Sequence, residues 1–542
     1  MTTPETALPR LSGHAVRQAL RAGQEIALID VREEHPFAQE HPLFAAQLAY
    51  SRLELDAPWR LPRRDVSLVV YDDGEGLAEP AARRLQALGL TQVSLLEGGL
   101  AGWRQGGGEL FRDVNVPSKA FGELVEHKRH TPSLAAGEVK ALLDAGADVV
   151  VLDARRFDEY QTMSLPQGIS VPGAELVLRV RELAPNPATQ VIVNCAGRTR
   201  SIIGTQSLVN AGLPNPVAAL RNGTIGWTLA GFALARGQSR RAGAVSPATR
   251  EQARSAAQAL AARAGAQRLD VASLAAPEPP GRTVYRYDVR SPEEYAAGHL
   301  PGFGSAPGGQ LVQETDVFAP VRGARLLLVD DDGVRAPMTA HWLAQMGWDV
   351  AWVADLPAAR FRDRSAWPAG VQGADAARIT AAELSDALAT GTATVIDLSA
   401  SASYVQRHVP GAWWALRSQA GAALQHIAQA GTAPRRLVLT CAQGDLAAFA
   451  AADFAARTDA PVQVLDGGNA AWFAAGRPAG AGEARLASPR IDRYRRPYEG
   501  TDNPREAMQG YLDWEFGLVA QLGRDATHGF RVLGPVPSPG MA

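Results

Sequence analysis

Two cysteines, Cys195 and Cys441, are the only ones among the 542 residues, and each follows a run of apolar residues. The segment that starts at Cys195 reads CAGRTRS (195–201) and contains two cations, Arg198 and Arg200. The thiolate is the reactive form of cysteine, and both nearby cations and the backbone N–H groups at a helix start favour it. This segment therefore predicts a nucleophilic cysteine that handles an anionic reactant.

A tight loop followed by a helix is needed to bring those groups together. The helix is predicted to begin near Ser201, whose hydroxyl could cap it. The glycine of the segment permits tight curvature, and at least one of the two arginines is expected to contact the anion. The residues of this predicted binding loop are Ala196, Gly197, Arg198, Thr199, Arg200 and Ser201.

The elements around the loop recur four times along the chain. An apolar run with an acidic residue near its end appears as ALIDVR (27–32), VVLDAR (150–155), YRYDVR (285–290) and TVIDLS (394–399). A second run follows each, as SLVVYD (67–72), QVIVNC (190–195), RLLLVDD (325–331) and RLVLTC (436–441). The acid and the end of the second run are 42, 42, 43 and 44 positions apart, which indicates four repeated modules.

Each repeat continues with a helical pattern and a third apolar run. Strands that alternate with helices predict an α/β fold, in which helices flank a mostly parallel central sheet. Three repeats end in a glycine turn and a tryptophan that we expect in the core, at Trp103, Trp227 and Trp472. The predicted modules cover 1–115, 130–237, 245–365 and 374–482, and a C-terminal helical extension covers 485–542.

The connecting segments carry further expectations. His127 and His130 are assigned to a solvated linker between the first two modules, and a helical stretch over 240–264 precedes the third. In the C-terminal extension a helix is predicted from Pro504 to Leu522, after a cap at Asp502 or Asn503. Aromatic residues of this extension lie among arginines. We expect them to dock on a module, with a place near the active module as one option, rather than to bind nucleic acid.

Three features together resemble the rhodanese family: the D-x-R head, as in DVRSPEEYAAGHLPG (288–302), the cysteine loop CAGRTRS and the glycine–tryptophan tail. The resemblance covers most of the chain in four copies. It implies a sulfurtransferase in which Cys195 takes a sulfane sulfur from thiosulfate or a related donor and holds it as a persulfide. A thiol, cyanide or a sulfur-accepting protein would then receive the sulfur. Asp153 and Arg155, at the end of the preceding strand, are expected to pair and to brace the loop.

The four modules differ at the position of the reactive cysteine. The first has Asp72 there, and the third is assigned Asp331. A carboxylate cannot store a sulfane sulfur and repels anionic donors, so both modules are expected to be inactive. The fourth keeps Cys441 but has Ser399 in place of the head arginine and Asp445 in its loop. Cys441 is therefore a candidate second site, with an inert thiol as the alternative.

Two other functions stay open. Rhodanese-related phosphatases need a Cys-x5-Arg loop, but the residue six positions after Cys195 is Ser201, and the one after Cys441 is Ala447. A non-catalytic array of binding modules is supported by the two aspartate modules and opposed by the intact loop at Cys195.

The composition of the chain excludes several other classes of protein. The net charge of −2 gives no electrostatic reason to bind nucleic acid or an anionic membrane, and no apolar run is long enough to predict a membrane span. Residues 1–10 lack the pattern of a signal peptide, and two distant cysteines do not make a disulfide framework. We therefore expect a cytoplasmic protein. No cluster of residues implies a cofactor or a metal, and the sequence does not indicate an oligomeric state.

Overall fold

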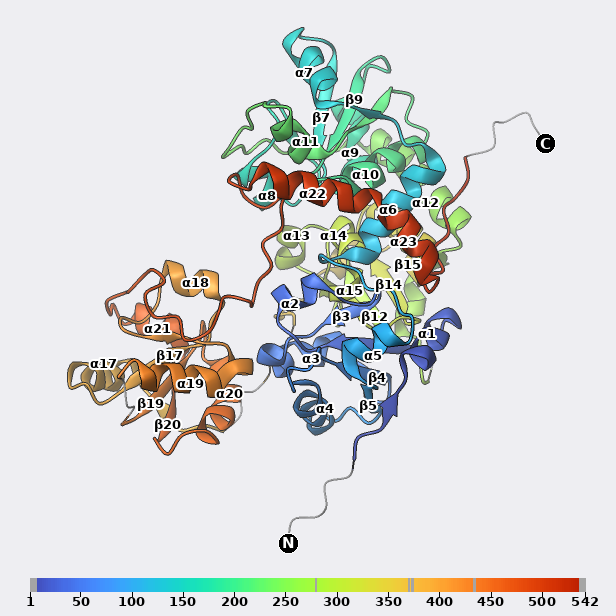
Figure 1. The fold of residues 1–542 in the computed structure, drawn as a ribbon. Helices are drawn as coiled ribbons and strands as arrows, with labels where there is room; N and C mark the ends of the chain where they lie inside the picture. The colour runs from blue at the N-terminus through green and yellow to red at the C-terminus, as the bar shows by residue number, and fades with distance from the viewer. Residues whose placement is uncertain (1–6, 278–279, 369–370, 372–374, 432–434, 536–542) are drawn as a thin grey trace.

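Four five-stranded sheets, each flanked by helices, make up the computed structural model, which describes residues 7–277, 280–368, 371, 375–431 and 435–535. The sheets and their helices are resolved as separate layers in Figure 1. Every pairing between the strands of these sheets is parallel, which confirms the predicted α/β class. The predicted boundaries at residues 1, 374 and 542 lie outside the described residues.

The strand order is the same in all four sheets: first, fifth, fourth, second, third. The first sheet contains β1 (Arg10–Leu11), β2 (Ile26–Asp30), β3 (Ala45–Gln47), β4 (Ser67–Tyr71) and β5 (Val93–Leu96). The second contains β6 (Ser133–Leu134), β7 (Val149–Asp153), β8 (Ile169–Ser170), β9 (Gln190–Asn194) and β10 (Val217–Leu220). The third contains β11 (Gln267–Leu269), β12 (Val284–Asp288), β13 (Gly304–Ser305), β14 (Arg325–Val329) and β15 (Asp349–Val353). The fourth contains β16 (Arg378–Ile379), β17 (Thr394–Asp397), β18 (Trp413–Trp414), β19 (Leu437–Thr440) and β20 (Val462–Leu465).

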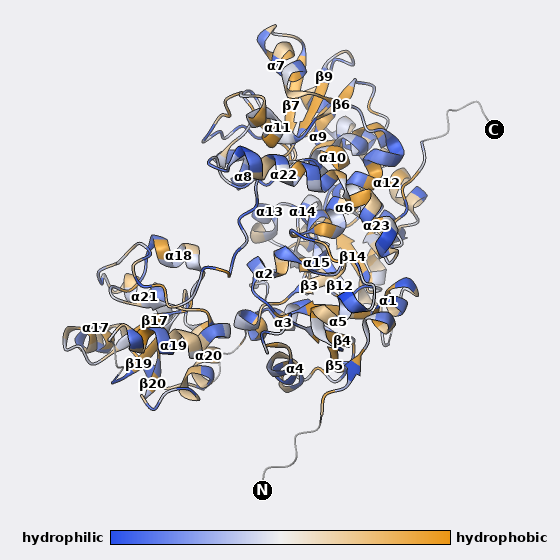
Figure 2. Ribbon diagram, viewed as in Figure 1, coloured by the Kyte–Doolittle hydropathy of each residue, from blue (hydrophilic) through white to orange (hydrophobic). Residues whose placement is uncertain are grey.

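The helices of modules 1 and 2 cover both faces of their sheets. Module 1 has α1 (Gly13–Arg21), α2 (Glu34–Gln39), η1 (Tyr50–Arg52), α3 (Leu53–Arg60), α4 (Ala78–Ala87) and α5 (Gly99–Gln105). Module 2 has α7 (Ala136–Asp144), α8 (Phe157–Thr162), η2 (Gly173–Glu175), α9 (Leu176–Leu183), α10 (Thr199–Asn210) and α11 (Gly223–Leu229). Figure 2 shows the hydrophobic strands enclosed by helices whose outer faces are hydrophilic.

The other two modules repeat this arrangement. Module 3 has α12 (Pro247–Ala264), η3 (Val271–Ala275), α13 (Pro292–Ala297), α14 (Gly308–Gln313), α15 (Thr315–Phe318), α16 (Arg335–Gln345) and η4 (Ala358–Arg360). Module 4 has α17 (Ala381–Ala389), α18 (Ser401–Gln406), η5 (Arg417–Gln419), α19 (Ala420–Gln429), α20 (Asp445–Ala455) and α21 (Gly468–Ala474). The tryptophans Trp103, Trp227 and Trp472 are core residues, as expected, and each indole N–H donates to a backbone carbonyl six residues later.

Two connecting segments differ from the predictions. The supposed linker between modules 1 and 2 is the helix α6 (Val116–Arg129), most of which is buried, with His127 in its last turn. The C-terminal extension forms two helices, α22 (Arg505–Phe516) and α23 (Leu518–Asp525), instead of one, and no side chain caps the first. Both helices pack against α6, far from module 4, which precedes them in sequence (Figure 1).

The modules pack in two similar pairs. In modules 2 and 3, η2 packs against α14, and in modules 1 and 4, η1 packs against η5. These contacting elements all follow the third strand of their sheet. Modules 1 and 3 also share one hydrophobic core. Each pair therefore joins one module with a cysteine to one with an aspartate at the predicted reactive position.

A buried ion network crosses the contact between modules 1 and 4. The Arg417 guanidinium is 1% exposed and donates to Glu54 at 2.5 and 2.8 Å and to Asp453 at 2.7 Å. Arg84 of module 1 pairs with the same two carboxylates. Because burial raises the pKa of both carboxyl groups, the two cations are needed to keep them charged.

We expect Arg417→Ala to weaken this contact by about 3 kcal/mol, because it leaves buried carboxylates with only Arg84 as a cationic partner. Urea unfolding of the whole chain, followed by far-UV circular dichroism, measures the loss. The matched control is Arg378→Ala, which breaks an ion pair with Asp466 whose side chains are 48% and 62% exposed. The control should change stability by less than about 1 kcal/mol. Equal losses in the two variants would contradict a role for the buried network.

Candidate active site

The position of the predicted reactive residue is defined by the register of the sheets. The acid that ends the second strand pairs with the last residue of the fourth, so Asp30 lies beside Tyr71 and Asp153 beside Asn194. The next residue along the chain starts the loop at the carboxyl edge of the sheet. That residue is Asp72, Cys195, Asp330 and Cys441 in the four modules.

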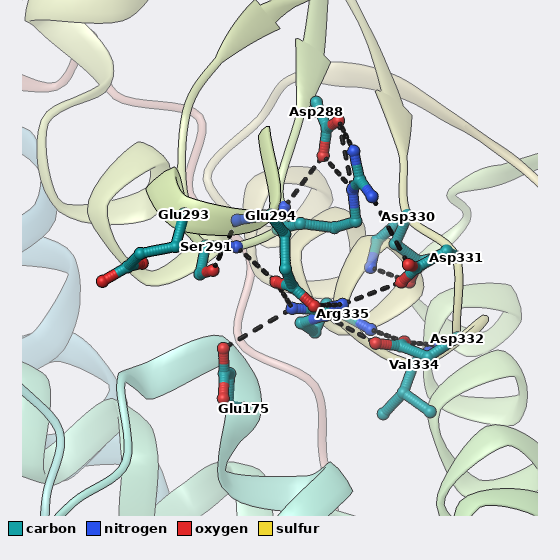
Figure 3. Close-up of polar contacts among 12 residues, drawn as sticks. Glu175, Asp288, Ser291, Glu293, Glu294, Asp330, Asp331, Asp332, Val334 and Arg335 are labelled. Carbon is teal, nitrogen blue, oxygen red and sulfur yellow. Dashed lines mark hydrogen bonds and ion pairs between the residues drawn. The ribbon is translucent and has the colours of Figure 1, made fainter. Parts of the chain in front are cut away.

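The assignment of Asp331 to this position was therefore wrong. β14 ends at Val329, which pairs with Asp288, so Asp330 is the equivalent of Cys195. The spacing from the acid is then 42 positions, as in modules 1 and 2. Asp331 instead accepts a hydrogen bond from Arg335 at 2.9 Å and one from Arg290 at 3.4 Å (Figure 3).

The loop at Cys195 is held from outside by the start of α11. The carbonyl oxygens of Cys195 and Ala196 accept hydrogen bonds from the backbone N–H groups of Thr224 and Ile225, at 2.9 and 3.0 Å. Gly223 has a φ of +55°, and a Cβ at this position would lie 2.4 Å from the carbonyl oxygen of Cys195. Only glycine fits this position, because the loop backbone packs directly on it.

The Cys195 thiol is buried, and its burial favours the protonated form. Its exposed fraction is 1%, and its Sγ donates to the Ser201 hydroxyl at 3.4 Å. Burial raises the pKa of the Cys195 thiol, and Arg200 and Ser201 only partly oppose this effect. Ser201 is not the predicted cap, because α10 already begins at Thr199, and its hydroxyl instead donates to the carbonyl oxygen of Arg198 at 2.8 Å.

The two loop arginines are occupied by glutamates of other elements. Arg198 donates to Glu123 of α6 at 2.7 and 2.9 Å, and it also pairs with Glu126. Arg200 forms two hydrogen bonds with Glu159 of α8, at 2.7 and 2.8 Å. The sequence predicted that at least one of these arginines contacts an anion. In the structure both guanidinium groups are paired with glutamates instead, because a buried cation needs a nearby countercharge.

Arg200 is one of several arginines that border accessible space. It lines a cavity of about 720 Å³ between modules 2 and 3 and a second of about 220 Å³ beside the C-terminal extension. Although burial alone would raise the pKa of Glu159, Arg200 lowers it to about 2, so this pair stays ionised across the physiological range.

Asp153 and Arg155 form the predicted pair and brace the strand that carries the cysteine. The Arg155 guanidinium donates to both carboxylate oxygens of Asp153, at 2.9 and 2.7 Å, and to the carbonyl oxygen of Met163. The side-chain amide of Asn194, the residue before Cys195, donates to Asp153 at 3.0 Å. These side chains thereby link the end of β7 to the end of β9, the strand that leads into the loop.

The C-terminal extension covers this loop. An ideal Cβ at Gly197 would lie 3.0 Å from the Tyr511 ring and 3.5 Å from a carboxylate oxygen of Glu515. Tyr511 donates its hydroxyl to Glu515 at 2.7 Å. Tyr498 packs edge-on against Tyr511, with 5.2 Å between their ring centres.

These residues, and Glu123 and Glu126 of α6, were not among the site residues predicted from the sequence. The aromatic residues of the extension did predict docking, with a place near the active module as one option, and the structure confirms it at the loop of Cys195. For α6 the available signal was the helical spacing of Val116, Ala120 and Leu124, with Pro117 in the first turn.

The loop at Cys441 has a different environment. Its rim residues Ala442, Gln443 and Asp445 are exposed, and the backbone N–H of Gly444 donates to the Cys441 sulfur at 3.2 Å. Burial raises the pKa of the Cys441 thiol, while hydrogen bonds from four backbone N–H groups, two in the loop and two in the first turn of α20, lower it. The missing head arginine is replaced by other donors, because Asp397 accepts from Ser399 and from Asn469.

In the other two loops a carboxylate replaces the sulfur. Asp72 accepts hydrogen bonds from the backbone N–H groups of Gly74, Leu77 and Ala78, at 3.2, 2.5 and 3.0 Å. Asp330 accepts from Gly333 and Ala336 at 3.0 and 2.7 Å. In modules 1 and 3, backbone N–H groups of the loop therefore donate to the carboxylate of the residue that starts the loop, Asp72 or Asp330.

Figure 3 shows how the module 3 loop is tied to its surroundings. Arg335, five positions after Asp330 as Arg200 is after Cys195, pairs with Glu294 at 2.6 Å and reaches Glu175 of module 2 at 3.5 Å. Among the described residues no three His, Cys, Asp or Glu side chains are grouped so that they could hold a metal ion. Within the same part of the chain, no helix has the length and apolar character needed to cross a membrane.

Comparisons with known proteins agree with this architecture. A family model described as Rhodanese-like domain matches residues 13–106, 135–230 and 380–475, together more than half of the chain. A crystal structure of thiosulfate sulfurtransferase from Pseudomonas aeruginosa is 65% identical, covers 97% of this chain and all of that chain, and superposes with a TM-score of 0.95. The third sheet lies outside the matched ranges but has the same strand order.

More distant relatives match single modules. The uncharacterized protein slr1261 of Synechocystis sp. is 34% identical over 101 residues, and this chain spans about half (55%) of the length of that relative. The Alr3790 protein of Anabaena sp. is 26% identical over 19% of this chain and 93% of that chain, with a TM-score of 0.19.

Because the carboxyl group of Glu515 is buried, docking of the extension can be tested through the pH dependence of the protein's stability. Burial, and then the nearby Glu123 carboxylate, raise its pKa from 4.5 to about 8, against the opposing effects of Lys119, Tyr511 and Arg198. Because the folded protein holds this proton and the unfolded chain does not, Glu515 lowers stability increasingly as pH rises from about 4.5 to about 8.

Glu515→Gln removes this titration and keeps the shape of the side chain. We expect its melting temperature to match that of the wild type near pH 4.5 and to exceed it near pH 8, because a neutral amide needs no proton to stay buried. Differential scanning calorimetry at several pH values measures the difference. Glu506→Gln, on the exposed side of the same helix, should change the melting temperature little at either pH. A difference between Glu515→Gln and wild type that does not vary with pH would show that Glu515 is not buried as a neutral acid.

Proposed function

The chain belongs to the rhodanese family, and from this we propose that it is a sulfurtransferase that carries a sulfane sulfur on Cys195. The sulfurtransferase type is supported by the 65% identity to thiosulfate sulfurtransferase over almost the whole chain. The observation that carries the choice of Cys195 is its loop, which starts at the sheet edge and leads into the N-terminus of α10 beside Arg200. Thiosulfate is the proposed donor, because a cation and a helix start both favour an anionic reactant.

The proposed reaction has two half-reactions. The Cys195 thiol first releases its proton to solvent, and the thiolate attacks the outer sulfur of thiosulfate. The sulfur–sulfur bond of the donor breaks, sulfite leaves with the electron pair, and Cys195 becomes a persulfide. In the second half-reaction cyanide or a thiolate attacks the outer sulfur of the persulfide and restores the Cys195 thiolate. An acceptor protein with a thiol is a further candidate.

The surrounding residues have proposed roles in these steps. Residues 196–201 form the anion-binding loop, in which Ser201 contacts the sulfur directly and Arg200 supplies positive charge. Asp153 and Arg155 position the loop through Asn194. The protein groups supply no redox step, since the donor brings the sulfur at the oxidation level of a sulfane.

The other modules divide into two kinds under this proposal. Modules 1 and 3 are inactive in sulfur transfer, because Asp72 and Asp330 cannot hold a sulfane sulfur and already bind the loop donors. Cys441 is a second candidate site, which the direct N–H contact to its sulfur supports. A cytoplasmic location is also part of the proposal, in keeping with two free cysteines.

A non-catalytic binding array remains the second candidate function. It is favoured by the carboxylates in two of the four loops and by the burial of Cys195 beneath the extension.

The position of the persulfide can be tested by intact mass. We expect the wild type to gain about 32 Da, one sulfur atom, after incubation with thiosulfate, and to lose it again on addition of cyanide. Cys195→Ser should lose most of the gain and of the transfer activity, whereas the matched control Cys441→Ser should keep most of both. The reverse result would place the reaction at Cys441. No gain from thiosulfate, mercaptopyruvate or glutathione persulfide would favour the binding array.

A further inference from the structure

The side chains that cover Gly197 in the Cys195 loop come from outside module 2. All loop residues from Cys195 to Thr199 are buried, yet the groups that face Gly197 are Tyr511 and Glu515 of α22. Arg198 is likewise covered, by the ring of Phe516 at 4.3 Å. In sequence, α22 lies beyond module 4, so a distant segment closes this site (Figure 1).

The helix is attached on two sides, because it packs against α6 as well as against α11. Met508, Tyr511 and Leu512 form a small hydrophobic cluster with Ile225 of α11, separate from the cores of the modules. The Arg505 guanidinium donates to the carbonyl oxygen of Leu229 at 2.7 Å, at the end of the same helix. A cluster of this size stabilises the docked helix only modestly, since most apolar area of the chain is buried elsewhere.

The contact between α22 and the loop also contains an unfavourable element. Glu515 is fully buried, and one of its carboxylate oxygens has no hydrogen-bond partner in the part of the chain that the structure describes. On its other side Lys119 of α6 lies 5.2 to 5.5 Å from the rings of Tyr498, Tyr511 and Trp514. A buried acid with an unpaired oxygen is costly, so the docked state is easier to leave than a well-packed core.

The fold does not require such a cover. In module 4 the loop at Cys441 keeps exposed rim residues, and in module 1 the loop residues 73–76 are exposed. Both loops have the same place at the edge of their sheet as the loop at Cys195. In module 3 the corresponding loop is also mostly buried, beside Arg254 of α12. Of the two loops that begin with a cysteine, the one at Cys195 is covered and the one at Cys441 is not.

We infer that segment 494–516 is a lid on the Cys195 site, and that a sulfur donor reaches Cys195 only after α22 has left the loop. The inference rests on the proposed function of Cys195 and adds a regulatory step to it. With the lid closed, Tyr511 and Glu515 lie against Gly197 of the loop. With the lid open, Gly197 faces solvent.

The surroundings of the lid fit this role. The cavity of about 220 Å³ extends to the edge of the closed lid at Tyr498, and both arginines (Arg155, Arg200) and carboxylates (Glu159, Glu314) line it. The closed state also keeps the thiol protonated, because burial raises the pKa of Cys195. Opening restores water to the loop and lets Arg200 and the helix start favour the thiolate.

Alkylation of the two cysteines separates the lid from the sulfur chemistry. The full chain is treated with iodoacetamide, and modification of the Cys195 and Cys441 peptides is followed by mass spectrometry. Tyr511→Ala should raise the alkylation rate of Cys195 about tenfold or more, since it removes the main contact with the loop. The rate at Cys441, which has no such cover, should stay the same. The matched control Gln509→Ala, on the exposed side of α22, should change neither rate.

Equal Cys195 rates in wild type and Tyr511→Ala would overturn the lid. Should Tyr511→Ala fail to fold, hydrogen exchange of the wild type provides the test. We expect the amides of 505–516 to exchange faster while thiosulfate converts Cys195 to the persulfide, and unchanged protection during conversion would overturn the inference. If lid variants expose Cys195 but thiosulfate adds no sulfur, the lid stands and the proposed function fails. If sulfur adds while the alkylation rates stay equal, the proposed function stands and the lid fails.

Discussion

The backbone N–H groups of the loop after the fourth strand of each sheet need an acceptor, and the residue that provides it decides what each module can do. Buried N–H groups without partners are strongly unfavourable. In modules 1 and 3 the carboxylates of Asp72 and Asp330 satisfy them, and these loops have no place left for a second anion. In modules 2 and 4 a cysteine stands at this position, and a thiol is a weaker acceptor that gains from becoming a thiolate or a persulfide.

This constraint explains why the modules keep one architecture while their chemistry differs. The acid at the end of the second strand accepts side-chain hydrogen bonds in every module, but its partners vary. Asp153 uses Arg155 and Asn194, whereas Asp397 uses Ser399 and Asn469. The loop position therefore survives the loss of the head arginine in module 4. A missing arginine in the motif is weak evidence that the loop itself has collapsed.

Features set by short stretches of sequence were predictable, and features set by distant partners were not. The repeated strands, the buried tryptophans and Cys195 at a strand end follow from local patterns. The error at Asp331 came from three consecutive aspartates, 330–332, which leave the end of the apolar run as the only guide to the register. The partners of the loop arginines, Glu123 and Glu159, come from other elements, so no local pattern could reveal that both cations are already paired.

The same distinction applies to the reactivity of the two cysteines. The loop with the more favourable sequence, at Cys195, is the more deeply covered, and the loop with an acidic residue, at Cys441, is open. Motif residues describe how a loop behaves in water, but the pKa of a thiol depends on what covers it. Tyr511 and Glu515 lie more than 300 residues after Cys195 and are part of no repeated module. Control of the Cys195 site by these residues therefore requires the whole chain. Module 2 without the C-terminal extension would lack this control.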